Sequence, residues 1–217
     1  MAGILLGGTN IPKISYGSTP IQKVSLGTLP IWSAVVFTPV TTQFTTTGSF
    51  TYNIPAECAR LDVIVLGGGG GGQASLAIFA YGAPGGPGGW KGATLVRGVD
   101  IDASITQITG RVGVGGAGGP GPSISPGFPG QSSTASCTGF SLEGAQGDGG
   151  VLAVGSQAAT RGKGPGNFTW NGILYTGGAD NTANSQDGKV PGGAGNGSAQ
   201  LSRGYDGGRG QVWIRAY

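Results

Sequence analysis

Six consecutive glycines, Gly67 to Gly72, follow directly after the apolar run Leu61 to Leu66. The chain holds 49 glycines among its 217 residues. Each ordered glycine costs about 0.5–1 kcal/mol relative to alanine, which sums to tens of kcal/mol here. An ordered fold must offset that cost by something other than side-chain packing. Lateral hydrogen bonding between extended glycine backbones, and burial against other subunits, are the two candidates.

The charge balance favours a folded chain over a disordered one. Only 10% of the residues are charged and the net charge is +3, so self-repulsion cannot keep the chain open. The chain lacks a strict Gly-X-Y period, which excludes a collagen triple helix. Closely spaced, hydrogen-bonded backbones are therefore the simplest use for so much glycine. The cost of ordering them also indicates a rigid oligomer.

A repeat with a period of ten residues opens the chain. Residues 11–20 and 21–30 share the pattern of an alternating strand that is predicted to close with a Gly-x-x-Pro turn, and a degenerate copy precedes them. Such strands are too short to bury a face alone. They could form a small solenoid, a meander, one strand set of an intertwined trimer, or a simple hairpin. We assign residues 1–36 as an assembly or trimerisation segment.

The rest of the chain, residues 37–217, is predicted to be one glycine-rich β domain. No window has a convincing helical period, and glycine or proline interrupts almost every stretch of ten residues. The all-β prediction follows from alternating or continuous apolar runs, which place strands at residues 50–54, 61–66, 93–97, 105–114 and 211–215.

The sequence offers no catalytic or cofactor-binding motif. The glycines after Leu66 match the letters of a dinucleotide fingerprint, but the helix and the acidic residue that this fingerprint needs are missing. Histidine is absent, which removes Ser-His and Cys-His nucleophile pairs and most zinc sites. Asp100 and Asp102 could form a carboxylate pair on a strand, although a solvated strand edge is favoured. We predict no enzyme activity, cofactor or metal.

Other partner classes are also disfavoured. The basic residues are scattered singly, so no nucleic-acid footprint is expected. No secretory signal and no apolar run of about 18 residues is present, so no membrane insertion is expected. Cys58 and Cys137 are either small buried residues or one bridge that closes a long loop.

Aromatic residues are the best candidates for ligand contacts. Tyr81, Trp90, Trp170 and Tyr175 lie in or beside glycine-rich segments. Flat aromatic faces among short polar residues suit the binding of sugar rings. The same side chains could instead fill the small core between glycine segments, and the sequence leaves both interpretations open.

Several segments together resemble the glycine-rich minor tail proteins of phages that infect mycobacteria and related actinobacteria. The resemblance covers nearly the whole chain and is carried by the decapeptides and by residues 48–55, 61–70, 168–178 and 208–217. It implies a virion protein at the tail tip with a β-sandwich-like body and polyglycine segments of the polyglycine II type. It assigns no catalytic residue.

The sequence and the resemblance together predict a homotrimer, made in the host cytoplasm and built into the virion among other tail proteins. Its loops are expected to face the host, where the aromatic residues would contact envelope glycans. A purely structural tail component is the main alternative. An ice-binding protein with stacked polyglycine helices is a second alternative, and a measurement of thermal hysteresis would distinguish it.

Overall fold

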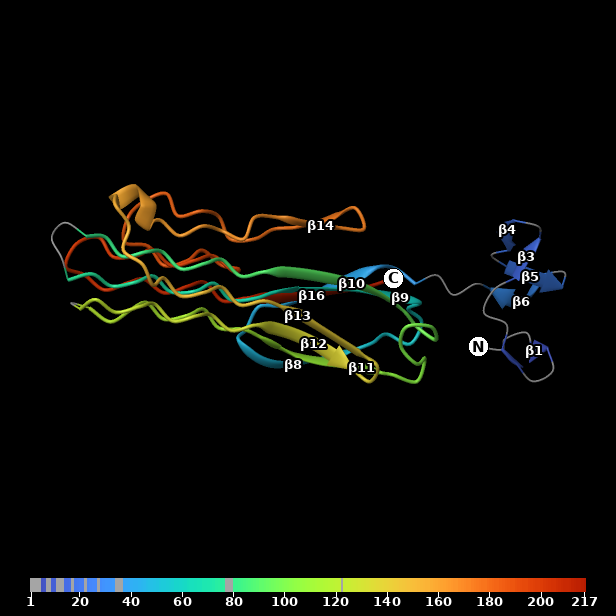
Figure 1. Cartoon of the computed structure of the whole chain (residues 1–217). Helices are drawn as coiled ribbons and strands as arrows, with labels where there is room; N and C mark the ends of the chain where they lie inside the picture. Colours follow the sequence, from blue (N-terminus) through green and yellow to red (C-terminus); the bar gives the residue numbers. More distant parts are fainter. Residues whose placement is uncertain are drawn as a thin grey trace. The chain divides into compact units, whose positions relative to one another are not determined.

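The computed structural model describes residues 5–6, 9–10, 14–16, 18–21, 23–26, 28–33, 37–76, 80–121 and 123–217. The chain separates into two compact units, Met1–Thr38 and Pro39–Tyr217. Figure 1 labels most strands of both units. The all-β prediction is confirmed, since the only helix among the described residues is the single 3-10 turn η1, Gln157–Thr160. None of the described helices is long and apolar enough to cross a membrane.

The described residues of the first unit form three antiparallel strand pairs, β1 with β2, β3 with β4 and β5 with β6. Their closing pairs recur every ten residues, at Leu6↔Thr9, Tyr16↔Thr19 and Leu26↔Leu29, so each decapeptide supplies one closing pair. Pro20 and Pro30 each lie in the second strand of a pair, opposite Ser15 and Ser25 respectively, and not in a turn. This corrects the expected Gly-x-x-Pro turn. The strands are β1 Leu5–Leu6, β2 Thr9–Asn10, β3 Ile14–Tyr16, β4 Thr19–Ile21, β5 Lys23–Leu26 and β6 Leu29–Ser33.

The second unit begins with two four-stranded antiparallel sheets, an arrangement consistent with the expected β-sandwich. In the first sheet the order is β10-β9-β16-β7, and in the second it is β13-β12-β11-β8. The strands are β7 Val40–Phe44, β8 Gly48–Asn53, β9 Arg60–Leu66, β10 Trp90–Val96, β11 Gln107–Val112, β12 Ser133–Cys137, β13 Phe140–Gly144 and β16 Gln211–Ala216.

The core between the sheets follows the alternation of their strands. β9 is buried on both faces, as its continuous apolar run predicts, and it lies against β12 and β13. Because neighbouring side chains on a strand point to opposite faces, the set that begins with Leu61 faces the second sheet. The buried side chains of this core are Leu61, Val63, Val65, Leu95, Ile108, Val112, Ala135, Leu142, Val212 and Ile214.

The structure corrects the expected strand position of Asp100 and Asp102 and settles the state of the cysteines. Asp100 and Asp102 lie in the connection after β10 rather than on a strand, and each carboxylate accepts a backbone N–H, from Val96 and Ser104 respectively. The hydrogen bonds from Ser104 hold the pKa of Asp102 below its usual value. Cys58 and Cys137 are both free thiols, so the alternative with one bridge is wrong, and burial raises both pKa values.

Beyond the sheets the second unit continues as a bundle of extended glycine segments. Residues 67–75 form its central segment. One neighbouring segment is residues 83–89. The N–H groups of Gly67, Gly70 and Gln73 donate to its carbonyl groups at residues 89, 86 and 83, so every third residue of the central segment bonds to it. Two further neighbours, residues 125–131 and 202–208, accept the intervening N–H groups in the same way.

Three more segments donate to carbonyl groups of the central segment. Gly116 and Gly119 donate to Gly69 and Gly72, and residues 147–150 and 195–198 repeat this three-residue step. Six neighbours therefore surround residues 67–75. A step of three matches an extended helix with three residues per turn and a rise of about 3.1 Å per residue, which gives the segment a length of roughly 25 Å. We call residues 67–75 and their six neighbours the polyglycine bundle.

Glycine is required in this bundle because of space. A Cβ atom on Gly70 would lie 1.9 Å from the carbonyl oxygen of Asp148, and one on Gly72 would lie 1.8 Å from that of Asn196. The glycines of the central tract do not have positive φ angles, so the requirement is close approach and not left-handed backbone. The lateral bonding expected from the sequence is thus made within a single chain.

Candidate functional site

A small hairpin covers the outer face of the first sheet. Its strands are β14 Phe168–Trp170 and β15 Ile173–Tyr175, and Figure 1 shows it beside β10. Asn171 and Gly172 have φ angles of 46° and 75°, which is the backbone of a two-residue type I′ turn. An Asn-Gly pair between apolar residues is a strong hairpin signal, and it is the local feature that could have predicted these strands.

An aromatic cluster fills the space between this hairpin and the sheet. The ring centroids of Trp90 lie 5.5 Å from Phe168 and 5.3 Å from Trp213, and Phe168 stacks on Trp170 at 5.9 Å. Tyr175 meets Trp213 edge-on at 5.7 Å. Ile64 and Leu66 of β9 form the floor of the cluster. The hairpin is therefore held by stacked rings rather than by a backbone ladder to the sheet.

The structure brings together three of the four aromatic residues singled out from the sequence. Trp90, Trp170 and Tyr175 all belong to the cluster, and Tyr175 is only 3% exposed. Tyr81 lies elsewhere, where its backbone bridges to Val154 and its hydroxyl accepts a hydrogen bond from Gln200. Core packing thus accounts for the first three positions, and their role in ligand binding remains a prediction.

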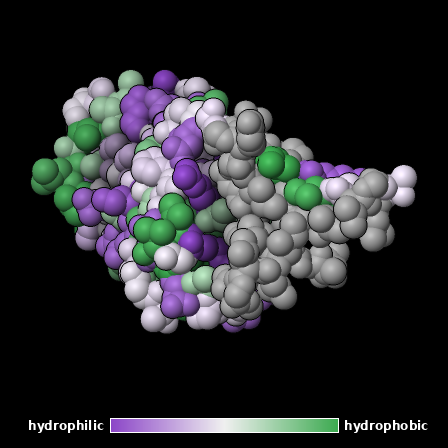
Figure 2. Space-filling model, turned by 90° about the vertical axis from the view of Figure 1, so that its right-hand side faces the viewer, coloured by the Kyte–Doolittle hydropathy of each residue, from purple (hydrophilic) through white to green (hydrophobic). Residues whose placement is uncertain are grey.

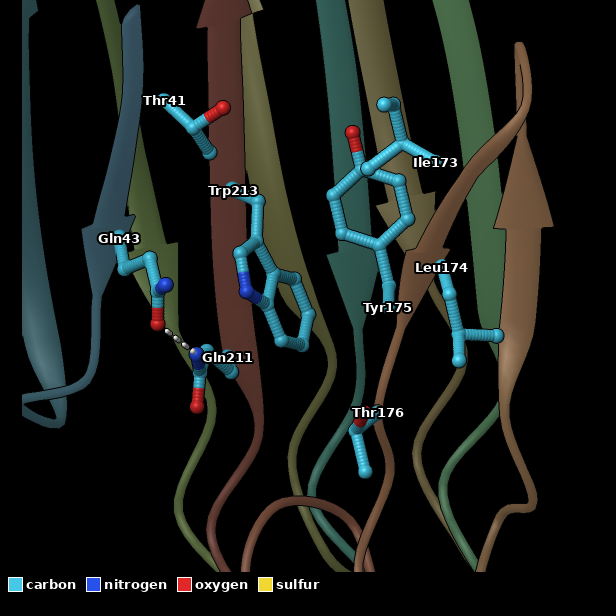
Figure 3. A pocket seen from close by; sticks show the side chains of 8 residues that line it. All are labelled: Thr41, Gln43, Ile173, Leu174, Tyr175, Thr176, Gln211 and Trp213. Atoms are coloured by element: carbon cyan, nitrogen blue, oxygen red, sulfur yellow. Dashed lines mark hydrogen bonds between the residues drawn. The ribbon is translucent and has the colours of Figure 1, made fainter.

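One edge of the cluster opens into a shallow groove of about 370 Å³. Figure 3 shows Tyr175 and Trp213 between the Gln43 side of the groove and the Leu174 side. The Gln211 amide donates to Gln43 at 3.1 Å, which fixes both amides at the rim. The lining residues are Thr41, Gln43, Ile173, Leu174, Tyr175, Thr176, Gln211 and Trp213.

Neutral side chains give this groove its chemistry. Hydroxyl and amide groups supply hydrogen bonds, and the aliphatic and aromatic groups supply contact area. None of the lining residues is Asp, Glu, Lys or Arg. Burial, and after it the charge of Asp62, raises the pKa of the Tyr175 phenol, which therefore stays neutral at physiological pH. The groove is suited to binding an uncharged polar ligand. Among the described residues no cluster could hold a metal ion.

A buried carboxylate fixes the turn of the hairpin. Asp62 is fully buried, and its Oδ1 accepts from Thr94 at 2.7 Å, from Asn171 at 2.9 Å and from the Tyr217 hydroxyl at 3.1 Å. Arg215 lies 3.6 Å from Oδ2 and supplies the opposing charge. In the sequence Asp62 is only one acidic residue among nine, because its partners are far away along the chain.

The indole of Trp170 joins the same network. Its Nε1 donates to Thr94 at 3.1 Å, and Gly92 on the same strand leaves room for the ring. A Cβ atom on Gly92 would lie 3.0 Å from ring atoms of Trp170. The network of Asp62, Thr94, Trp170, Asn171, Arg215 and Tyr217 therefore orients the aromatic cluster and the groove beside it.

The sandwich, the polyglycine bundle and the aromatic hairpin together define a rigid glycine-rich β domain with a groove lined by neutral side chains. Residues 45–217 match the protein family described as "Glycine-rich domain", and the chain belongs to this family. It is similar to the "Gene 32 protein" of Mycobacterium phage L5, with 46% identity over 193 residues that cover 86% of this chain and 85% of the relative. It is also similar to the "Gene 32 protein" of Mycobacterium phage D29, with 41% identity over 230 aligned residues and full coverage of both chains. It is thus a phage-encoded homologue of these gene 32 proteins.

Proposed function

We propose that this chain is a structural protein of the phage tail tip that contributes to recognition of the host surface, and that it acts by binding rather than by catalysis. One observation carries the proposal: the polyglycine bundle holds a set of loops at the end of the second unit that lies farthest from its junction with the first unit. A phage-encoded relative of gene 32 proteins with this architecture is suited to displaying loops from a particle.

The placement of that junction follows from strand register. Pro39 precedes β7, where Val40 pairs with Ala216, and Ala216 pairs with Leu61 at the start of β9. The central glycine segment leaves from the other end of β9, after Leu66. The chain therefore enters the second unit at one end of the sandwich, while the bundle leads away from the other end.

Assembly is assigned to the first unit. Within the second unit, hydrogen bonds from one chain surround the central glycine segment, so the glycine cost gives no reason to require a partner there. The short hairpins of residues 1–36 lack a face large enough to be stable alone, and association as a homotrimer would supply it. Other tail proteins are the proposed neighbours of this segment in the particle.

A second host contact, besides the displayed loops, is assigned to the groove beside the aromatic cluster. Trp213 and Tyr175 are 5% and 3% exposed and form the buried wall of the groove. Gln43, Gln211 and Thr41 offer neutral hydrogen-bonding groups, which suit an envelope glycan. A weak site of this kind would gain avidity from three copies in a trimer.

The proposal is tested on purified phage particles. We expect mass spectrometry to find the chain in the particles, with a copy number divisible by three, and antibody labelling to mark the tail tip. Particles that lack the chain would contradict the proposed location. Labelled particles that adsorb normally when antibody covers the second unit would support the purely structural alternative instead.

A further inference from the structure

Four loops meet at the far end of the polyglycine bundle, and we call their described residues the distal tip: 74–76 with 80–81, 120–121 with 123–126, 150–160, and 198–202. Ala74 donates to the carbonyl of Ser125 at 2.9 Å, and isolated β-bridges join Ser75 to Ser202 and Tyr81 to Val154. Figure 1 shows the described parts of these loops at the left end of the drawing. The four loops therefore form one surface supported by a rigid base.

Exposed aliphatic side chains gather on this surface. Leu152 is 75% exposed and Ile124 is 71% exposed, and every loop contributes at least one such residue. Figure 2 is turned by 90° so that the right-hand side of Figure 1 faces the viewer, and on that face hydrophobic residues lie in separate patches among hydrophilic ones. The exposed aliphatic residues of the tip are Leu76, Ile124, Val151, Leu152 and Leu201.

The same loops carry no charge. None of their residues is Asp, Glu, Lys or Arg. Arg203 borders the last loop with a side chain that is 56% exposed, and its guanidinium lies over the ring of Tyr205 and 3.8 Å from Asp206. Arg161 borders the third loop and donates to Asn184. The nearest cations in the sequence thus make contacts within the domain.

We propose that the distal tip binds an uncharged lipid layer by inserting its aliphatic side chains among acyl chains. This is a peripheral contact, and it needs none of the membrane-spanning segments that the sequence lacks. Apolar groups without charges match such a layer, whereas anionic headgroups attract Lys and Arg residues that the tip lacks. Protein interfaces concentrate binding energy in Trp, Tyr and Arg. Among the described residues of the tip only Tyr81 is of these types, and it is half-buried with its hydroxyl hydrogen-bonded to Gln200. The proposal deepens the proposed host contact and rests on it for the source of the lipid layer, the host envelope.

The test uses the purified full chain and vesicles of phosphatidylcholine, which have no net charge. We expect the chain to bind these vesicles equally at low and at high salt, because no ion pair is involved. The double variant Ile124→Ser/Leu152→Ser should lower the partition coefficient at least tenfold, since two exposed aliphatic groups are removed. The matched control is Val99→Ser, which changes a 79% exposed aliphatic residue outside the tip and should leave binding unchanged.

Three outcomes would overturn the proposal. The first is absence of binding to neutral vesicles, including the case in which the chain binds only a protease-sensitive component of the host surface. The second is binding that needs anionic lipid and disappears with salt, and the third is equal loss in the tip variant and the Val99 control. Vesicle binding does not depend on where the chain lies in the particle, so failure here and failure of the proposed tail location are separate results.

Discussion

Replacing Gly70 with valine will prevent the second unit from reaching its native packing. The added Cβ would lie 1.9 Å from the carbonyl oxygen of Asp148, and the atoms in the way are backbone atoms that cannot rotate aside. Gly70 also donates to Gly86 and accepts from Gly195, so moving its backbone breaks bonds to two segments at once. We expect a loss of more than about 4 kcal/mol, which exceeds the effect of most single substitutions.

The measurement is thermal unfolding followed by circular dichroism, with Gly155→Ala as the matched control. A Cβ atom on Gly155 would have no other atom within 4 Å, and this glycine has no positive φ angle, so alanine there should change the melting temperature little. For a domain of this size the Gly70 loss corresponds to a decrease of roughly 10 °C or more. If Gly70→Val melted within a degree or two of the parent, the tract would be a loosely packed loop.

Replacing Asp62 with alanine will release the hairpin that carries the aromatic cluster. The substitution leaves Arg215 without its counter-charge and leaves Thr94, Asn171 and Tyr217 without their shared acceptor. Removal of one partner from a buried charged pair costs about 3–5 kcal/mol. We therefore expect the melting temperature to fall by roughly 10 °C, and the fluorescence of the packed tryptophans to shift to longer wavelength.

Two further variants distinguish loss of the Asp62 hydrogen-bond network from loss of a negative charge elsewhere. Asp62→Asn keeps an oxygen acceptor at the same place and should lose less stability than Asp62→Ala. Asp180→Ala removes an exposed carboxylate that pairs with Lys163 at 2.9 Å, and it should lower the melting temperature by no more than about 2 °C. If Asp62→Ala resembled Asp180→Ala, the hairpin would be held by the aromatic rings alone.

The strands that the sequence predicts best are those with an apolar signal of their own. The continuous run Leu61 to Leu66 predicts β9, and Gln211 to Arg215 predicts β16. By contrast, β12 has the sequence Ser-Thr-Ala-Ser-Cys, which has no apolar alternation. It forms because it pairs with β11 on one side and β13 on the other, and such pairing is not visible in a local window.

The candidate site is predictable only in part, for a similar reason. The aromatic residues Trp90, Trp170 and Tyr175 stand out in the sequence, but only the fold shows that they stack on one another. Trp213 lies on a predicted strand that gives it no role, and its ring lines the groove. Asp62 interrupts an apolar run, yet its partners lie 32 to 155 residues away, beyond the reach of a motif.

Amide hydrogen exchange tests the polyglycine bundle most directly, because it needs no substitution. The N–H groups of Gly67 to Gly72 each donate to a named carbonyl oxygen at 2.8–3.2 Å, although these residues belong to no strand. We predict that they exchange as slowly as the amides of Val63 to Leu66 in β9, because both sets open only with the whole domain. Exchange of the six glycine amides within seconds, while β9 stays protected, would contradict the bundle and the rigid display of the distal tip that depends on it.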